Sequence, residues 1–160
     1  MGTAPTDRLA HALALATPAG LLAGAYIGQW GFGLPPCEMC WWQRYPHFAA
    51  LALALLAFIA PPRRVWLAFA ALAIAASGVI GAFHAGVEYG WWQGVTACTA
   101  SPAMGGGDPL AAVLNAPLVR CDVAPWSLAG ISLAGWNFLF SIASALAIFI
   151  LLAKGRKAVR

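Results

Sequence analysis

Four cysteines are the residues of this sequence best suited to chemistry, and they fall into two pairs of different spacing. The first pair lies in the motif Pro36-Cys37-Glu38-Met39-Cys40, a C-x-x-C arrangement. Two intervening residues let the sulfurs meet in a small, strained ring, and strained, exposed disulfides exchange readily. Structural disulfides more often close longer loops. We therefore interpret Cys37 and Cys40 as a redox-active pair.

The second pair, Cys98 and Cys121, is separated by a long loop that contains the three consecutive glycines Gly105–Gly107. A disulfide across this loop would contribute roughly 3 kcal/mol in the chain-entropy model, so a purely structural role is one interpretation. A glycine run predicts a hinge, which an exchanging thiol needs and a structural disulfide does not. We favour a second redox-active pair. The pairing itself stays open, because four cysteines allow several connectivities.

Polar residues follow the first pair, with Gln43 and Arg44 before His47. If a helix begins near Cys40, Arg44 lies one turn further along the same face, and His47 shares that face. A helix N-terminus and a nearby guanidinium both favour a thiolate at Cys40. An arginine at the edge of an apolar segment needs a partner. It either reaches the lipid headgroups or donates to a ring carbonyl such as that of a quinone, whose developing charge it would stabilise.

His84 and Glu88 are one helical turn apart at the end of an apolar segment. They are candidates for proton movement, and the alternative is anchoring at the membrane interface. Two such ligands without a third do not predict a metal site. Four sulfurs could in principle hold zinc tetrahedrally, an alternative that an oxidising compartment would disfavour.

The composition indicates that the solvent around these residues is lipid. The chain is 62% hydrophobic and 9% charged, whereas a soluble domain carries about 25% charged residues. The net charge of +4 does not indicate nucleic-acid binding, since most of the basic residues cluster at the ends of apolar segments.

Four apolar stretches approach the roughly 20 residues that cross a bilayer as a helix. We expect one membrane domain of the all-α class, a polytopic four-helix bundle, with spans at about 9–30, 45–60, 65–87 and 126–153. The connecting loops on the cysteine side cover about 31–44 and 88–125. A cleaved signal peptide is the alternative for the first stretch, but its apolar run exceeds the usual length of about 7–15 residues.

The basic residues predict the orientation, because loops rich in Lys and Arg stay in the cytoplasm. Seven of the nine basic residues share one side: Arg8, Arg63, Arg64, Lys154, Arg156, Lys157 and Arg160. Only Arg44 and Arg120 lie on the other side, together with all four cysteines. We therefore expect cytoplasmic N- and C-termini and cysteines on the oxidising outer side, where disulfides persist.

The long loop holds a short apolar segment, Leu110–Val119, which cannot cross the bilayer. It predicts an interfacial helix on the outer leaflet. The alternative is a soluble loop with a hydrophobic plug.

Together these features resemble the disulfide-bond formation protein B (DsbB) family of bacterial inner membranes over nearly the whole chain. The first part of the resemblance is Pro36-Cys37-Glu38-Met39-Cys40 followed by Gln43-Arg44. The rest is His84-Ala85-Gly86-Val87-Glu88-Tyr89-Gly90-Trp91-Trp92 before Cys98, and Asp122, Trp126, Gly130, Ser132 and Trp136-Asn137 after Cys121.

The resemblance implies a quinone-reducing protein-disulfide oxidoreductase in the bacterial inner membrane. Its partner would be the periplasmic thiol oxidase DsbA, and its electron acceptor ubiquinone, with menaquinone as the alternative. By the resemblance, reduced DsbA attacks Cys98, the freed Cys121 exchanges with Cys37, and Cys40 becomes a thiolate beside the quinone. Arg44 matches the family's quinone-contacting arginine, and Gln43, His47 and His84 are the further candidates for quinone contact.

Two rival functions remain to be separated from this one. A paralogue dedicated to another thiol oxidase would differ only in its partner. A small transporter would be marked by an unpaired acid deep within a helix, and the acids here lie near segment boundaries.

Overall fold

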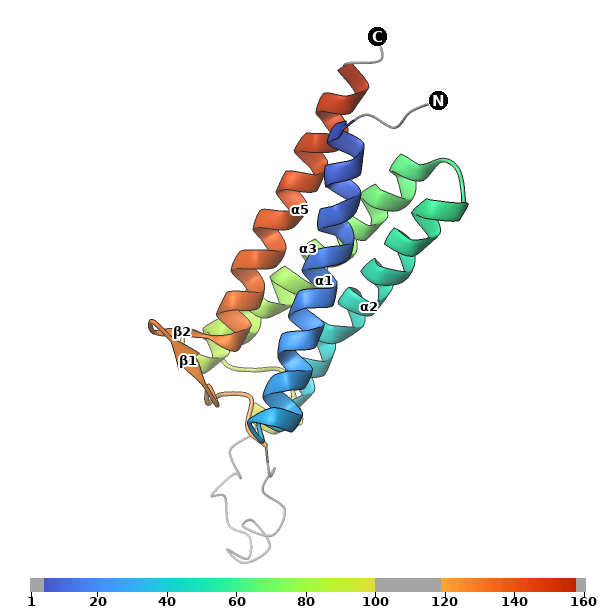
Figure 1. The fold of residues 1–160 in the computed structure, drawn as a ribbon. Helices are drawn as coiled ribbons and strands as arrows, with labels where there is room; N and C mark the ends of the chain where they lie inside the picture. Colours follow the sequence, from blue (N-terminus) through green and yellow to red (C-terminus); the bar gives the residue numbers. More distant parts are fainter. Residues whose placement is uncertain (1–4, 100–118, 158–160) are drawn as a thin grey trace, which may run out of the picture.

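Four long helices make up most of the fold of this chain (Figure 1). The computed structural model describes residues 5–99 and 119–157 of the 160 residues. The helices are α1 (Pro5–Gly31), α2 (Glu38–Ile59), α3 (Arg63–Glu88) and α5 (Leu133–Lys157). A short 3-10 helix, η1 (Ala97–Thr99), carries Cys98, and the antiparallel strands β1 (Ser127–Leu128) and β2 (Ile131–Ser132) precede α5. The predicted all-α bundle is confirmed.

Within the described residues, three helices are long and apolar enough to cross a membrane: α1, α3 and the part Leu133–Gly155 of α5. The same criterion does not select α2, whose first turns carry Gln43, Arg44 and His47. All three side chains are buried inside the bundle, so they face protein and not lipid. Polar side chains within membrane segments are ordinarily found in that position.

The start of α1, the end of α5 and the turn between α2 and α3 lie at one end of the bundle, which we call the basic end (Figure 1). The opposite end carries the start of α2, the end of α3 and the two strands, and we call it the cysteine end. The helix α3 packs most extensively against α2 and α5. The helix α1 packs mainly against the same two helices. This arrangement brings the starts of α2 and α5 against the end of α3.

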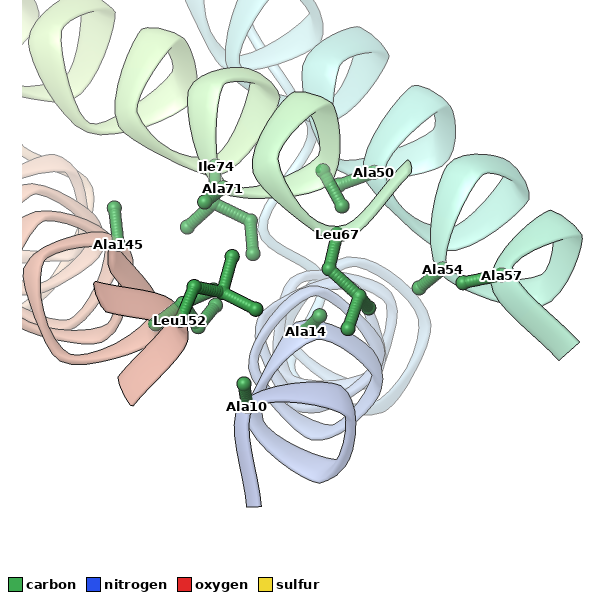
Figure 2. Close-up of a cluster of buried hydrophobic side chains, with 12 residues drawn as sticks. Ala10, Ala14, Ala50, Ala54, Ala57, Leu67, Ala71, Ile74, Ala145 and Leu152 are labelled. Atoms are coloured by element: carbon green, nitrogen blue, oxygen red, sulfur yellow. The ribbon is translucent and has the colours of Figure 1, made fainter. Parts of the chain in front are cut away.

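The core near the basic end consists mainly of small side chains, which let the helices approach closely (Figure 2). Alanines of α1, α2 and α5 surround Leu67 and Ile74 of α3. Both of these larger side chains are fully buried.

Two helix boundaries differ from the predicted spans. The helix α2 begins at Glu38, well before the predicted span start near residue 45, because Cys37 caps it. The predicted start of the fourth span at Trp126 is too early, since β1 and β2 form a hairpin there. Its two-residue turn, Ala129-Gly130, has positive φ at both positions, 52° and 76°, as the favoured hairpin turns require.

Part of the long loop cannot be compared with prediction. Residues 100–118, which include the predicted glycine hinge and most of the predicted interfacial helix, lie outside the described residues.

Candidate active site

The first cysteine pair occupies the first turn of α2. Cys37 is the N-cap residue, and its Sγ accepts a hydrogen bond from the backbone N–H of Cys40 at 3.2 Å. The two sulfurs lie 2.8 Å apart, and both cysteines are free thiols. The hydrogen bond to Cys40 and the burial of its own sulfur raise the pKa of the Cys37 thiol. Cys37 is therefore held as the protonated donor of the pair.

The second pair forms a disulfide between Cys98 and Cys121, with a Cα–Cα distance of 5.4 Å. The backbone N–H of Cys121 also donates to the carbonyl oxygen of Cys98 at 3.2 Å. The Thr96 hydroxyl lies 3.0 Å from Cys98 Sγ. Both cysteines are buried, and they belong to one apolar cluster with Cys37.

The two pairs meet at His84. Cys37 Sγ, a ring nitrogen of His84 and Cys121 Sγ all lie within 4.8 Å of one another. Thiol–disulfide exchange requires a thiolate to approach a disulfide sulfur directly, and this arrangement places Cys37 next to the sulfur of Cys121. The same three groups would make a metal site only if the Cys98–Cys121 disulfide were first reduced, because a metal-binding sulfur is a thiolate.

Backbone carbonyl groups fix the tautomer of His84. Gln43 Nε2 donates to the carbonyl of Met39 at 3.1 Å and so must be the amide nitrogen. The same nitrogen lies 2.9 Å from His84 Nδ1, which therefore accepts. His84 Nε2 lies 3.1 Å from the carbonyl oxygen of Cys121, which demands an N–H there. The ring is thus neutral, and its single N–H points at the two cysteine pairs, with Cys37 Sγ 3.6 Å away.

A buried network of side chains supports Gln43 from α5. Asn137 Nδ2 donates to Gln43 Oε1 at 2.8 Å, and Asn137 Oδ1 lies 2.9 Å from His47 Nε2. Ser77 of α3 donates to the carbonyl of Gln43 at 2.8 Å. The close approach depends on Gly81, where an added Cβ would come within 2.9 Å of the carbonyl oxygen of Ala134.

Arg44 points toward α1. Its guanidinium donates to Gln29 Oε1 at 2.7 Å and to the carbonyl of Ala25 at 3.3 Å. It also lies between the rings of Tyr26 and Trp41, 4.8 Å from each centroid. The alternative that Arg44 reaches the lipid headgroups does not fit, because only 5% of the residue is exposed.

A cavity of about 220 Å³ opens beside the first pair. Most of its lining is apolar and comes from α1 and α5, while Cys40, Arg44, His47 and His84 supply polar atoms. His47 Nδ1 is buried and has no hydrogen-bond partner in the described part of the chain. A cavity of roughly 150 Å³ accommodates benzene, so this one admits a single substituted ring.

All nine residues singled out in the sequence converge at the cysteine end: Cys37, Cys40, Gln43, Arg44, His47, His84, Glu88, Cys98 and Cys121. Gln29, Ser77 and Asn137 also belong to the site but were not predicted to be part of it. An amide or a hydroxyl within an otherwise apolar span was the available signal, since such groups usually face protein.

Comparison with known proteins identifies the family of this chain. The family described as "Disulfide bond formation protein DsbB" matches residues 7–151. A disulfide bond formation protein B from Marinobacter nauticus is 33% identical, over 93% of this chain and 94% of its own length. The one from Verminephrobacter eiseniae is 34% identical, over 96% and 89%. No solved structure matches the chain. The chain therefore belongs to the DsbB family of disulfide bond formation proteins.

Proposed function

We propose that this chain reoxidises a periplasmic thiol oxidase of the DsbA type and passes the electrons to a membrane quinone. Membership of the DsbB family carries the coarser function, disulfide bond formation. The observation that best supports the finer proposal is the position of Cys37 beside both His84 and Cys121. It places the sulfur that Cys121 must attack within reach of the second pair.

The exchange steps balance in atoms and electrons. A thiolate of the reduced partner attacks Cys98, the Cys98–Cys121 bond breaks, and Cys121 leaves as a thiolate. Cys121 then attacks Cys37 of the oxidised first pair and releases the Cys40 thiolate. The second thiolate of the partner attacks the disulfide between the partner and Cys98 and frees Cys98. Cys98 then attacks Cys121 of the Cys121–Cys37 disulfide, which restores the Cys98–Cys121 bond and leaves Cys37 reduced. The partner is oxidised by two electrons, and the first pair is reduced by two.

These exchange steps leave the second pair as a disulfide and the first pair reduced. The four cysteines of the structure are in that state. The N–H of His84 supports the exchange because it faces Cys37 and can stabilise negative charge on sulfur.

The cavity beside Cys40 is suited to the ring of a quinone. Arg44 and the unpartnered Nδ1 of His47 would hold the ring's polar groups, with Gln43 and His84 behind them. A quinone supplies an acceptor for two electrons and two protons. Ubiquinone is the proposed acceptor, and menaquinone has the same ring carbonyl chemistry. Arg44 supports the Cys40 thiolate through its charge.

We place the basic end in the cytoplasm and the cysteine end in the periplasm of the bacterial inner membrane. The excess of Arg at the turn between α2 and α3 supports this orientation. It exposes the cysteine end to the compartment in which disulfides persist.

The test mixes purified full-length protein with reduced DsbA and a ubiquinone analogue and follows the quinone absorbance. Parent protein should reduce the quinone with stoichiometric oxidation of DsbA, and Cys40→Ser should abolish that reduction. In Cys40→Ser each chain should oxidise at most one equivalent of partner, because no Cys37–Cys40 disulfide can form to restore the Cys98–Cys121 bond. The proposal fails if the parent protein leaves the quinone oxidised, or if Cys40→Ser turns over like the parent.

A further inference from the structure

Glu88 is the last residue of α3, and it occupies a position between two cavities. One is the cavity beside Cys40, which we call the inner cavity. The other, which we call the outer depression, is an open hollow of about 1100 Å³ on the cysteine end, lined by Trp91, Trp92 and Asp122 among others. Of the residues lining these two cavities in the described part of the chain, Glu88 alone lines both. It is also the only acid among the residues that line the inner cavity.

The carboxylate of Glu88 is buried and only partly satisfied. Its side chain is 2% exposed, and Oε1 lies 3.7 Å from His84 Nε2. Its other oxygen, Oε2, is buried and has no hydrogen-bond partner in the described residues. Buried polar groups normally have partners, so an orphaned carboxylate oxygen calls for an explanation.

The chemistry of the site supplies one. Oxidation of the pair to a disulfide, with Cys37 a thiol and Cys40 a thiolate, releases two electrons and one proton, whereas reduction of a quinone to a quinol takes up two of each. Protons must therefore pass between the sulfurs, the ring and water as the electrons move. A carboxyl group that lines both the inner cavity and the outer depression is placed to carry these protons.

The other titratable groups of the inner cavity are less suited to this task. Arginine does not deprotonate in proteins. His84 is occupied on both nitrogens, by Gln43 and by the Cys121 carbonyl. His47 does not line the outer depression.

We propose that Glu88 is the proton-carrying residue of this site, moving protons between water in the outer depression and the cavity beside Cys40. This inference rests on the proposed function, because it presumes a proton-coupled acceptor in that cavity. Glu88 accepts the Cys37 proton as the pair is oxidised and delivers it to the reduced ring, and it passes in the second proton from water in the outer depression.

Several charged or titratable groups bear on Glu88 and belong in any account of its pH dependence. The charge of Glu88 acts on both Cys37 and Cys40. The residues of α1 and α5 that line the inner cavity carry no charge, and Ser132 of β2 is a neutral hydrogen-bonding group. Among the described residues, the ionisable groups that contact Glu88 or line one of its two cavities are His84, Cys37, Cys40, Arg44, His47, Tyr89 and Asp122.

The central experiment compares Glu88→Gln, which keeps the shape but cannot titrate, with Glu88→Asp, which keeps the carboxyl. Quinone reduction should slow at least tenfold in Glu88→Gln, and added formate should restore much of the rate. Glu88→Asp should keep at least half of the parent rate. Exchange between the reduced partner and Cys98–Cys121 should stay within twofold in both variants.

A second readout needs no quinone and no turnover. In reduced protein, the rate at which iodoacetamide alkylates Cys40 should follow a pH profile displaced to lower pH in Glu88→Gln, because a negative charge near the sulfur is gone. The matched control is Asp122→Asn, which removes an acid of the outer depression that does not line the inner cavity. Its quinone reduction and its Cys40 profile should stay close to those of the parent.

The inference is overturned if Glu88→Gln reduces quinone at the parent rate with the parent pH dependence. It is also overturned if added formate does not restore quinone reduction in Glu88→Gln, because a loss of activity caused by a packing defect would not be rescued by formate. If the parent protein itself does not reduce quinone, the proposed function fails, and the Cys40 alkylation profile still reports separately whether Glu88 acts on the pair.

Discussion

His84 donates a hydrogen bond from Nε2 to the carbonyl oxygen of Cys121, 3.1 Å away, and so ties α3 to the second cysteine pair. The same N–H faces Cys37 Sγ at 3.6 Å. One imidazole therefore sits where the two pairs would exchange in the proposed function, and its tautomer is set by Gln43. Removal of the imidazole should therefore slow the exchange between the two pairs more than it slows the other steps.

His84→Ala should slow disulfide transfer from Cys98–Cys121 to the first pair by roughly 10- to 100-fold. A hydrogen bond to a charged group contributes about 1.5–3 kcal/mol, and about 1.4 kcal/mol corresponds to a factor of ten. Single-turnover quenching with mass analysis of the cysteine pairs measures the rate. The control is His11→Ala, which removes an equally buried histidine that bonds the Ala54 carbonyl at the basic end. Equal slowing in both variants would contradict a local role of His84.

Arg44→Ala should raise the apparent KM for quinone about tenfold or more, with a smaller effect on kcat. The guanidinium lines the cavity and is held by Gln29 and two aromatic rings, so it is already in place before a ligand arrives. Arg44→Lys should rescue little, because an ammonium lacks the planar, forked geometry. Arg120→Ala, at an exposed arginine of the same end, is the control and should behave as the parent. A parent-like KM in Arg44→Ala would remove Arg44 from the quinone site.

Asn137→Ala should lower the free energy of unfolding by about 1–2 kcal/mol, near the upper range for polar contacts between membrane helices. The change leaves Gln43 Oε1 and His47 Nε2 without their amide partner. Unfolding of purified protein in mixed micelles measures the loss. Ser144→Ala, which removes the hydrogen bond from Thr17 at 2.9 Å, is the control and should cost less. A neutral Asn137→Ala would show that the network does not hold α5 in place.

Cys37 should become reactive only above the ordinary thiol range near pH 8.5. The hydrogen bond to Cys40 and burial raise its pKa, so its thiol form persists as the pH rises and the thiolate appears late. Alkylation of reduced protein across pH, read by peptide mass, measures this. Cys40→Ser removes the sulfur partner and should move the Cys37 midpoint to lower pH. An unchanged midpoint would mean that the neighbouring sulfur does not control Cys37.

The sequence contained enough information to predict the helices and the end at which the cysteines gather. A long apolar segment in lipid has few alternatives to a helix. Because successive spans cross the membrane in opposite directions, their order assigns each loop to one end of the bundle. It was also enough to connect Arg44 with Cys40, since both lie on the start of α2.

Contacts between helices were not predictable in the same way. The helix α5 is apolar on nearly all sides, so no periodicity identifies the inward face that carries Asn137. The contact of Asn137 with Gln43 further depends on the absence of a side chain at Gly81. The orientation of Arg44 toward Gln29 depends on the rotation of α1 about its own axis, which hydropathy leaves undefined.

The sulfur of Cys37 closes the first turn of α2 by accepting the N–H of Cys40. In the proposed exchange that atom changes covalent partners in every cycle, so the helix end would lose and regain its capping hydrogen bond each time. We therefore expect the turn that carries Cys40 toward the cavity beside it to loosen and tighten in step with the proposed electron transfer.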